Sequence, residues 1–216
     1  DAAELHEYLR TYGSLKDQDK PLVVSGILLA LDDKFFKPDD LLGDETTTDG
    51  QLIYDAIQRR LKASNVGPDV KRDKLMSEFS IIRTSARLNE IDTKLGKTPL
   101  KFYTEFLKKN VFDNIKYRSS SEDFIGRFYG EFMSYSGGDG QTLGIVLTPR
   151  HICDLFCNLL DIQATDIVLD PCCGTAGFLV AAMHHMLEKA GADQNKRKNI
   201  KKKQLHGFEL QSNMFA

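Results

Sequence analysis

Apolar residues recur at helical spacing through the first 117 residues of the chain. Four segments carry this pattern, over residues 22–36, 52–61, 70–91 and 100–115, with breaks rich in proline, glycine or asparagine between them. Pro21 suits the start of the first segment, because the fixed φ of proline fits the first turn of a helix. No segment alternates apolar and polar residues as a half-buried strand does. We therefore expect an all-α N-terminal domain over residues 1–118, with its leucine and aromatic side chains in the core.

Two further helix starts are visible in the middle of the chain. Ser119–Glu122 has the spacing of a capping box, which predicts a helix that continues through Phe132. Thr148 followed by Pro149 predicts another start, with a threonine cap and proline at the first helical position. The glycine-rich residues 136–140 between them are typical of a flexible link. The second helix carries one apolar side, made of Ile152, Leu155, Phe156, Leu159 and Leu160.

The hydrophobic pattern changes at residues 166–178, which read Asp-Ile-Val-Leu-Asp-Pro-Cys-Cys-Gly-Thr-Ala-Gly-Phe. The apolar, β-branched run before Asp170 is typical of a buried central strand. Gly174 and Gly177 predict a tight turn with positive φ angles, because glycine lacks a Cβ. A helical pattern begins at Phe178. Strand, small-residue turn and helix form the first half of a nucleotide-binding α/β unit.

A second short apolar strand is predicted at Gln204–Leu210, and Glu209 near its end is placed to bind ribose hydroxyls.

The turn after Asp170 argues against a dinucleotide as the ligand. The first glycine of the dinucleotide fingerprint is missing from this turn, and Asp170 would repel a pyrophosphate. The carboxylate instead favours a ligand with an α-ammonium group, such as S-adenosylmethionine. Each feature also has a simpler interpretation without a ligand. Residues 166–178 would then be an ordinary strand-turn-helix, and Glu209 would be an exposed charge at the end of a strand.

Composition limits the class of protein without giving a function. The chain has 216 residues, of which 28% are charged and 41% hydrophobic, and its net charge is −2. These values are ordinary for a soluble protein and give no overall nucleic-acid signal. No apolar run approaches the roughly 18 residues of a membrane-spanning helix, and no signal peptide is visible. We therefore expect a cytoplasmic protein without a membrane partner.

Residues 196–203 are a local exception, because they hold six cations and no acid. A solvated loop is the plain interpretation, and contact with DNA phosphates is the alternative.

The cysteines of the chain are Cys153, Cys157, Cys172 and Cys173. They include no Cys-x-x-Cys pair, and adjacent cysteines rarely chelate one ion. Although His151 is near in sequence, we expect buried free thiols in a reducing compartment and no metal site.

Three motifs in a fixed order resemble a known family: Leu147-Thr-Pro-Arg150, then Asp170-Pro-Cys-Cys-Gly-Thr-Ala-Gly-Phe178, then Gly207-Phe-Glu209. The chain looks like the modification subunit of a type I restriction-modification system. Such subunits are S-adenosylmethionine-dependent DNA methyltransferases that act on adenine N6. The resemblance runs from about Glu122 to the last residue.

The resemblance implies a fold and a site. The fold would be an α/β Rossmann-like methyltransferase domain over residues 119–216, with only its first half present, preceded by the all-α domain. The family's Thr-Pro helix start lies against the methionine end of the cofactor. The implied S-adenosylmethionine-binding residues are Leu147, Thr148, Pro149, Arg150, Asp170, Gly174, Thr175, Ala176, Gly177, Phe178 and Glu209.

Catalysis in the family depends on an Asn-Pro-Pro-aromatic motif that holds the flipped adenine. That motif lies further downstream in the family, and none of the six prolines here is followed by another. We therefore expect the N-terminal part of a longer protein, inactive by itself and without a catalytic residue. The implied partners are double-stranded DNA and the sequence-specificity and restriction subunits of one complex, with two modification subunits in each.

Two alternatives stay open. The first is a stand-alone DNA or RNA methyltransferase with the same cofactor, and a downstream Asn/Asp-Pro-Pro-aromatic motif would favour transfer to an amino group. The second is a non-catalytic helical interaction module attached to a degenerate Rossmann-like domain. Failure of the full-length protein to bind the cofactor would support the second.

Overall fold

The computed structural model describes residues 2–17, 19–64, 68–116 and 148–210. The chain divides into two compact units, residues 1–139 (unit 1) and residues 140–216 (unit 2). The boundary predicted after residue 118, the capping box at Ser119–Glu122 and Leu147 lie outside the described residues and stay predictions. Within the described ranges, every helix is too short or too polar to cross a lipid bilayer.

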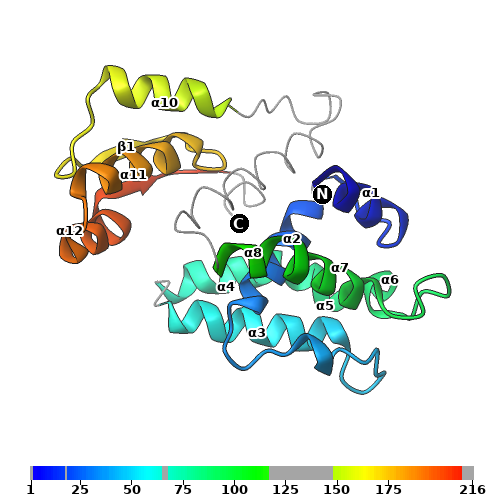
Figure 1. Ribbon diagram of the computed structural model, residues 1–216. Coiled ribbons are helices and arrows are strands. Elements are labelled where there is room, and N and C mark those ends of the chain that lie inside the picture. Colours follow the sequence, from blue (N-terminus) through cyan, green and yellow to red (C-terminus); the bar gives the residue numbers. More distant parts are fainter. Residues whose placement is uncertain (1, 18, 65–67, 117–147, 211–216) are drawn as a thin grey trace. The chain divides into compact units, whose positions relative to one another are not determined.

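Unit 1 is helical wherever its described residues form regular elements, except for one isolated antiparallel bridge between Asp92 and Lys97 (Figure 1). This confirms the predicted helical N-terminal part. Its elements are α1 (Ala2–Thr11), α2 (Lys20–Leu31), the 3₁₀ turn η1 (Pro38–Asp40), α3 (Asp49–Ala63), α4 (Asp69–Glu78), α5 (Ser80–Thr84), α6 (Ala86–Asn89), α7 (Pro99–Leu107), the π-helical η2 (Lys108–Phe112) and α8 (Asp113–Lys116).

The core of unit 1 is organised around α2. This helix is apolar around nearly its whole circumference, as expected of a helix that is buried on all sides. The helices α3, α5 and α7 pack against it, and Val23, Ile27 and Ala30 are almost completely shielded from solvent. Pro21 lies in its first turn, as the sequence predicts.

The helix predicted over residues 70–91 is divided into α4, α5 and α6. The chain becomes extended at Ser85, where ψ is 110°. The side-chain amide of Asn89 donates to the carbonyl oxygens of Ile82 and Ser85, both at 2.9 Å. These bonds give the backbone carbonyls at the break a hydrogen-bond partner. Oδ1 of Asn89 also accepts the N–H of Gly50 at 2.7 Å, which ties this break to the start of α3. Apolar spacing carries no sign of these polar bonds, so the sequence suggested one continuous helix.

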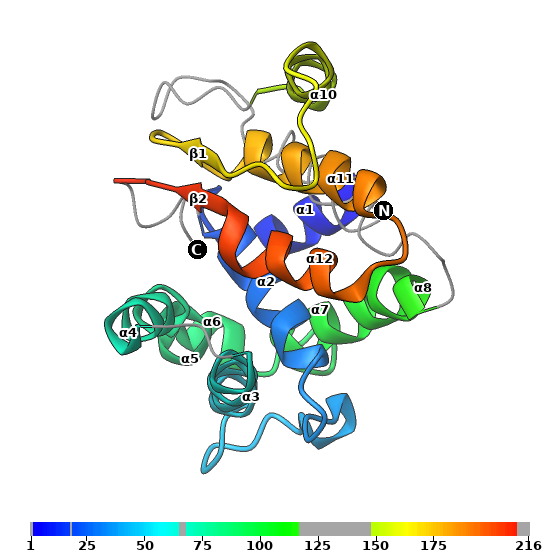
Figure 2. The same ribbon diagram turned by 90° about the vertical axis from the view of Figure 1, so that its left-hand side faces the viewer.

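Unit 2 is built on two parallel strands joined through helices (Figure 2). In the strand pairing, Asp170 lies opposite Gly207. The buried core of unit 2 lies between α10, α11 and η3. The elements of unit 2 are α10 (Arg150–Leu159), β1 (Val168–Asp170), α11 (Gly177–Ala190), α12 (Gln194–Asn199), the π-helical η3 (Ile200–Gln204) and β2 (Leu205–Gly207).

Two apolar segments of unit 2 are more exposed than the sequence predicts. Leu159 is 74% exposed, and Cys153 and Cys157 occupy the α10 positions that face the core. Ile167, in the run expected to form a buried central strand, is 71% exposed, and Leu169 is 58% exposed. Within the described part of the chain, the sheet around this run consists of β1 and β2 alone.

Candidate functional site

The ends of the two strands bring together residues that are far apart in sequence. Because β1 and β2 run parallel, Asp170 at the end of β1 and Glu209 just beyond β2 lie at the same edge of the sheet. The backbone N–H of Gly174 donates to Oε2 of Glu209 at 2.9 Å. This bond joins the turn after β1 directly to the end of the second strand, and parallel sheets bind their ligands at this edge.

Backbone hydrogen bonds hold the turn after β1 against the second strand. Phe208 N–H donates to the Asp170 carbonyl oxygen at 3.0 Å, and Cys173 N–H donates to the Phe208 carbonyl oxygen at 2.9 Å. Cys172 N–H donates to Oδ1 of Asp170 at 3.1 Å. The other carboxylate oxygen of Asp170 makes no hydrogen bond with a described residue, so it remains an acceptor for a ligand.

The positive φ angles of this turn fall at Gly174 (φ +53°) and Ala176 (φ +64°). The prediction for Gly177 is wrong, because Gly177 is already the first residue of α11. Ala176 takes the position before that helix, and no side chain caps the helix there. The first N–H groups of α11 therefore lack intrahelical partners and face the end of the turn. A left-handed alanine costs about 1–2 kcal/mol, and such strain is often found at binding sites.

Gly207 at the end of β2 is a packing position that sequence reasoning named in a motif but did not assign to the site. A Cβ at Gly207 would lie 2.7 Å from Cys173 Sγ and 2.8 Å from Leu179 Cδ1. Glycine therefore lets the turn and the first part of α11 pack closely on the strand. The available signal was a glycine inside a predicted strand, which often marks the close approach of another backbone.

The site is electrically negative. Burial is the main cause that raises the pKa of the Cys173 thiol, and the nearby Asp170 and Glu209 carboxylates raise it further. The thiol is therefore neutral at physiological pH and lies next to two carboxylates. This arrangement favours a cationic ligand over an anionic one.

The predicted burial of the cysteines is correct for Cys153 and Cys157 and wrong for Cys172, which is exposed, while Cys173 is half-buried. Burial raises the pKa of the first two thiols, as expected of small apolar core residues. Cys172 and Cys173 lie instead in the turn after β1, which the predicted turn glycines place at the surface.

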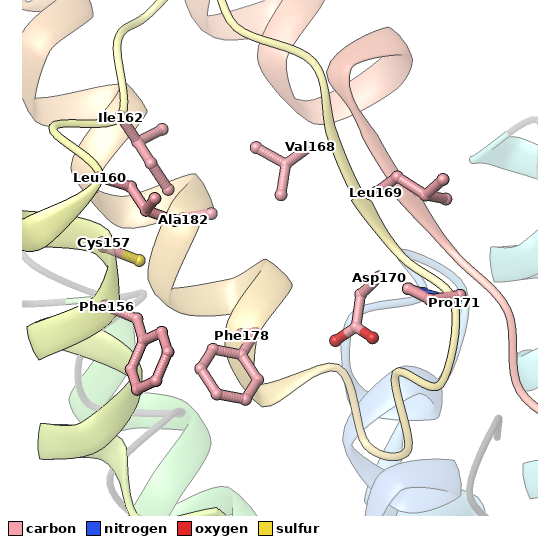
Figure 3. Close-up of a pocket in the computed structure, with 10 residues that line it drawn as sticks. All are labelled: Phe156, Cys157, Leu160, Ile162, Val168, Leu169, Asp170, Pro171, Phe178 and Ala182. Atoms are coloured by element: carbon pink, nitrogen blue, oxygen red, sulfur yellow. The ribbon is translucent and has the colours of Figure 1, made fainter.

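A pocket of about 230 Å³ lies beside β1 and reaches Asp170 at one edge (Figure 3). The rings of Phe156 and Phe178 form one end of it, with centroids 5.6 Å apart and planes at 77°. Pockets for whole drug-sized ligands measure roughly 300–1,000 Å³, so this one suits part of such a ligand. Its walls are Phe156, Cys157, Leu160, Ile162, Val168, Leu169, Asp170, Pro171, Phe178 and Ala182.

Sequence reasoning placed Asp170 and Phe178 in a site, and both line this pocket. It did not assign Phe156 to a site, although it placed that residue on the apolar side of α10. The spacing of apolar residues indicates a face, but it does not indicate whether core or cavity lies against that face.

Of the residues predicted at the start of α10, Thr148, Pro149 and Arg150 are described, and all three are exposed. Pro149, and not Thr148, takes the position before the helix, and no side chain caps it, so the predicted threonine cap is wrong. Arg150 Nε lies 3.6 Å from Asp154 Oδ2, one turn further along. Cys153 Sγ would be 3.8 Å from a Cβ at Gly177, which places the first turns of α10 beside the start of α11. Thr175 is exposed in the turn after β1.

Comparison with known proteins gives one family match. Residues 120–216 match the model of the N-6 DNA Methylase family. Those residues include the candidate site, from Thr148 to Glu209.

Two relatives carry names from restriction-modification systems. The type II restriction enzyme and methyltransferase RM.BcgI of Heyndrickxia coagulans is 42% identical over 217 residues, which cover 100% of this chain and 34% of the relative. The type I restriction enzyme MjaVII methylase subunit of Methanocaldococcus jannaschii is 30% identical over 83 residues, covering 38% of this chain and 14% of the relative. The chain thus spans about a third, or less, of the length of these curated relatives.

A solved structure shares the fold. It is the crystal structure of a modification subunit assigned to a type I restriction enzyme from Vibrio vulnificus YJ016. The TM-score is 0.62 at 19% identity, over 99% of this chain and 50% of that one. The family model and the two named relatives confirm the resemblance to restriction-modification methylases that the motifs suggested.

Proposed function

We propose that this chain, which is similar along its whole length to a restriction-modification methyltransferase, is the S-adenosylmethionine-binding part of a DNA adenine-N6 methyltransferase. One observation carries the proposal: the Gly174 N–H donates to Glu209 beside Asp170, within the residues that match the N-6 DNA Methylase family. Two carboxylates and a glycine turn at the ends of parallel strands suit a cationic nucleoside.

The proposed fold of unit 2 is the opening half of a Rossmann-like methyltransferase domain. The parallel pairing of β1 with β2, and the helices between them, support this assignment. The exposed Ile167 and Leu169 also agree with it, because strands of a complete parallel sheet are normally covered on both faces. We propose residues 119–216 as the extent of this half-domain.

Each carboxylate has a separate proposed role. Asp170 binds the α-ammonium group of the cofactor through the oxygen that has no hydrogen bond to a described residue. Glu209 binds the ribose hydroxyls, since its carboxylate lies just beyond the second strand and against the glycine turn, where an acidic residue meets the ribose in folds of this kind. The N–H groups at the start of α11 are available to polar atoms of the ligand.

The remaining predicted residues complete the proposed binding surface. The start of α10 would meet the methionine carboxylate, because it lies beside the start of α11. Phe178 would pack against the ligand at its end of the pocket. The other positions in the proposal are Leu147, Thr148, Pro149, Arg150, Thr175, Ala176 and Gly177.

Bound S-adenosylmethionine supplies a methyl group activated by attachment to a sulfonium. The residues of this chain hold and orient that group, and fixing two reactants in line can lower a barrier by several kcal/mol. A bound cofactor would let the sulfur–carbon bond be exchanged for a bond from carbon to adenine N6, and the amino group would then give up a proton. The groups that hold the adenine and accept the proton are proposed to lie in another part of the protein.

The relatives suggest how the protein assembles. One of them is named a restriction enzyme and methyltransferase together, and the other is named a methylase subunit. We propose double-stranded DNA as substrate and the cytoplasm as location. Association with sequence-specificity and restriction components is also proposed, either as separate subunits, with two modification subunits in each complex, or as parts of one chain.

The proposed reaction is tested on the protein at its natural full length, with PCR-amplified and therefore unmethylated genomic DNA. We expect N6-methyladenine to accumulate only when S-adenosylmethionine is present, as measured by mass spectrometry of the digested nucleosides. If a recognition component is separate, it is added as a co-expressed partner. Formation of 5-methylcytosine, or no methylated base with a folded protein and its partners, would contradict the proposal.

A further inference from the structure

Five exposed lysines lie within eight residues of α12 and η3. The eight residues from 196 to 203 contain no acid. We name this feature the lysine surface and define it by its exposed members, Lys196, Lys198, Lys201, Lys202 and Lys203.

Two other residues of this run anchor it to the body of unit 2. Arg197 is half-buried, and its Nη1 donates to the carbonyl oxygens of Leu187 and Gly191 at 3.1 and 3.2 Å. These carbonyls end α11, so Arg197 caps that helix. Ile200 is completely buried in the core against α11. The anchored face leaves the lysines on the outward side of the segment.

Most members of the lysine surface make no ion pair within the described part of the chain. Elsewhere cations pair with acids, as Arg59 does with Asp33 at 2.8 Å and Lys97 with Glu105 at 2.8 Å. Like charges four residues apart on a helix repel one another, and the chain as a whole is slightly acidic. The positive field is therefore a local feature. No ion pair with a described residue is made by Lys196, Lys198, Lys202 or Lys203.

The lysine surface lies at the opposite end of the strands from the candidate site. η3 leads directly into Leu205, the first residue of β2, whereas Asp170 and Glu209 are at or beyond the other ends of the strands (Figure 1). A strand of three residues spans roughly 10 Å. The lysines therefore belong to a separate surface and not to the wall of the cofactor site.

We propose that the lysine surface binds the phosphate backbone of duplex DNA outside the base pair that is methylated. Lysine ammonium groups act as point charges and carry no base-reading geometry, so this contact is independent of sequence. Its affinity comes from the release of counterions and falls steeply with salt. The choice of DNA over an acidic protein rests on the proposed function.

The test measures binding of a fluorescent duplex by anisotropy, with the protein at its natural full length and over a range of salt concentrations. One variant changes the five lysines of the lysine surface to glutamine. A matched control makes the same charge change at exposed lysines of unit 1, namely Lys34, Lys37, Lys62, Lys74 and Lys94. Calorimetric titration of S-adenosylmethionine is repeated on each protein as a separate readout of the proposed function.

We expect the first variant to bind DNA at least about tenfold more weakly near 0.1 M salt, and the control to bind it like the wild type. The slope of log affinity against log salt should shrink by up to about 4.5, because each neutralised phosphate contributes roughly 0.9. S-adenosylmethionine affinity should be equal in all three proteins. Lysine-dependent DNA binding without any cofactor binding would sink the methyltransferase proposal and leave this inference standing.

Three outcomes would overturn the inference. The first is wild-type DNA affinity and salt slope in the lysine-surface variant. The second is an equal loss in the control variant, which would show an effect of net charge alone. The third is binding of an acidic polyglutamate peptide that needs these lysines while DNA binding does not, which would assign the surface to an acidic protein.

Discussion

The Glu209→Ala variant is expected to bind S-adenosylmethionine more than about tenfold more weakly than the wild-type protein, a loss above roughly 1.4 kcal/mol. The substitution removes the proposed acceptor of the ribose hydroxyls. It also removes the oxygen that receives the Gly174 N–H at 2.9 Å, so the turn after β1 loses its tie to the second strand. Hydrogen bonds to charged groups contribute about 1.5–3 kcal/mol each. Calorimetric titration into the full-length protein measures the change.

Two further variants make this titration specific. Glu188→Ala removes an exposed acid from the last turns of α11, on the same unit, and should leave the affinity unchanged. Glu209→Gln keeps an acceptor oxygen for the Gly174 N–H but loses the negative charge. Its affinity for S-adenosylmethionine should therefore lie between that of Glu209→Ala and that of the wild type. A folded Glu209→Ala protein that binds as tightly as the wild type would exclude Glu209 from the cofactor site.

Gly50→Ala is expected to destabilise unit 1 by about 2–4 kcal/mol. A Cβ at Gly50 would overlap the carbonyl oxygen of Ile82 and lie 2.6 Å from Oδ1 of Asn89. Overpacking of this kind costs about 1–3 kcal/mol, and the lost bond from the Gly50 N–H to Asn89 adds about 1 kcal/mol. The carbonyl belongs to the backbone of α5, so no side-chain rotation relieves the overlap.

Urea denaturation, with hydrogen exchange to localise the change, measures this effect. Gly177→Ala is the matched control, because the same added Cβ there meets nothing nearer than Cys153 Sγ at 3.8 Å. The control should unfold like the wild type. A Gly50→Ala protein with unchanged stability and unchanged exchange in α3 would show that the junction of α3, α5 and Asn89 is wrongly described.

The sequence predicted the helical unit 1 and the strand-turn-helix at Asp170 because both depend on local signals. Apolar spacing and Pro21 indicate the central helix of unit 1, which the structure has at Lys20–Leu31. The glycine turn and the acid at the strand end were likewise readable, and Gly174 has the positive φ that was expected.

What the sequence did not predict depends on contacts between distant residues. The break at Ser85 is stabilised by Asn89 and Gly50, which lie 39 residues apart, and an apolar pattern contains no trace of such bonds. The close packing at Gly207 depends in the same way on Cys173 in a separate turn. The positive φ at Ala176 follows from the path between β1 and α11, so the neighbouring glycine was the natural but wrong choice.

Photochemical crosslinking of S-adenosylmethionine labelled in its methyl group tests the central claim most directly. The full-length protein is irradiated with the cofactor, digested and analysed by mass spectrometry. The account predicts label in peptides that contain Asp170–Phe178 or Gly207–Glu209, and its loss when unlabelled cofactor competes. Label confined to peptides outside unit 2, or no competed label on a folded protein, would contradict it.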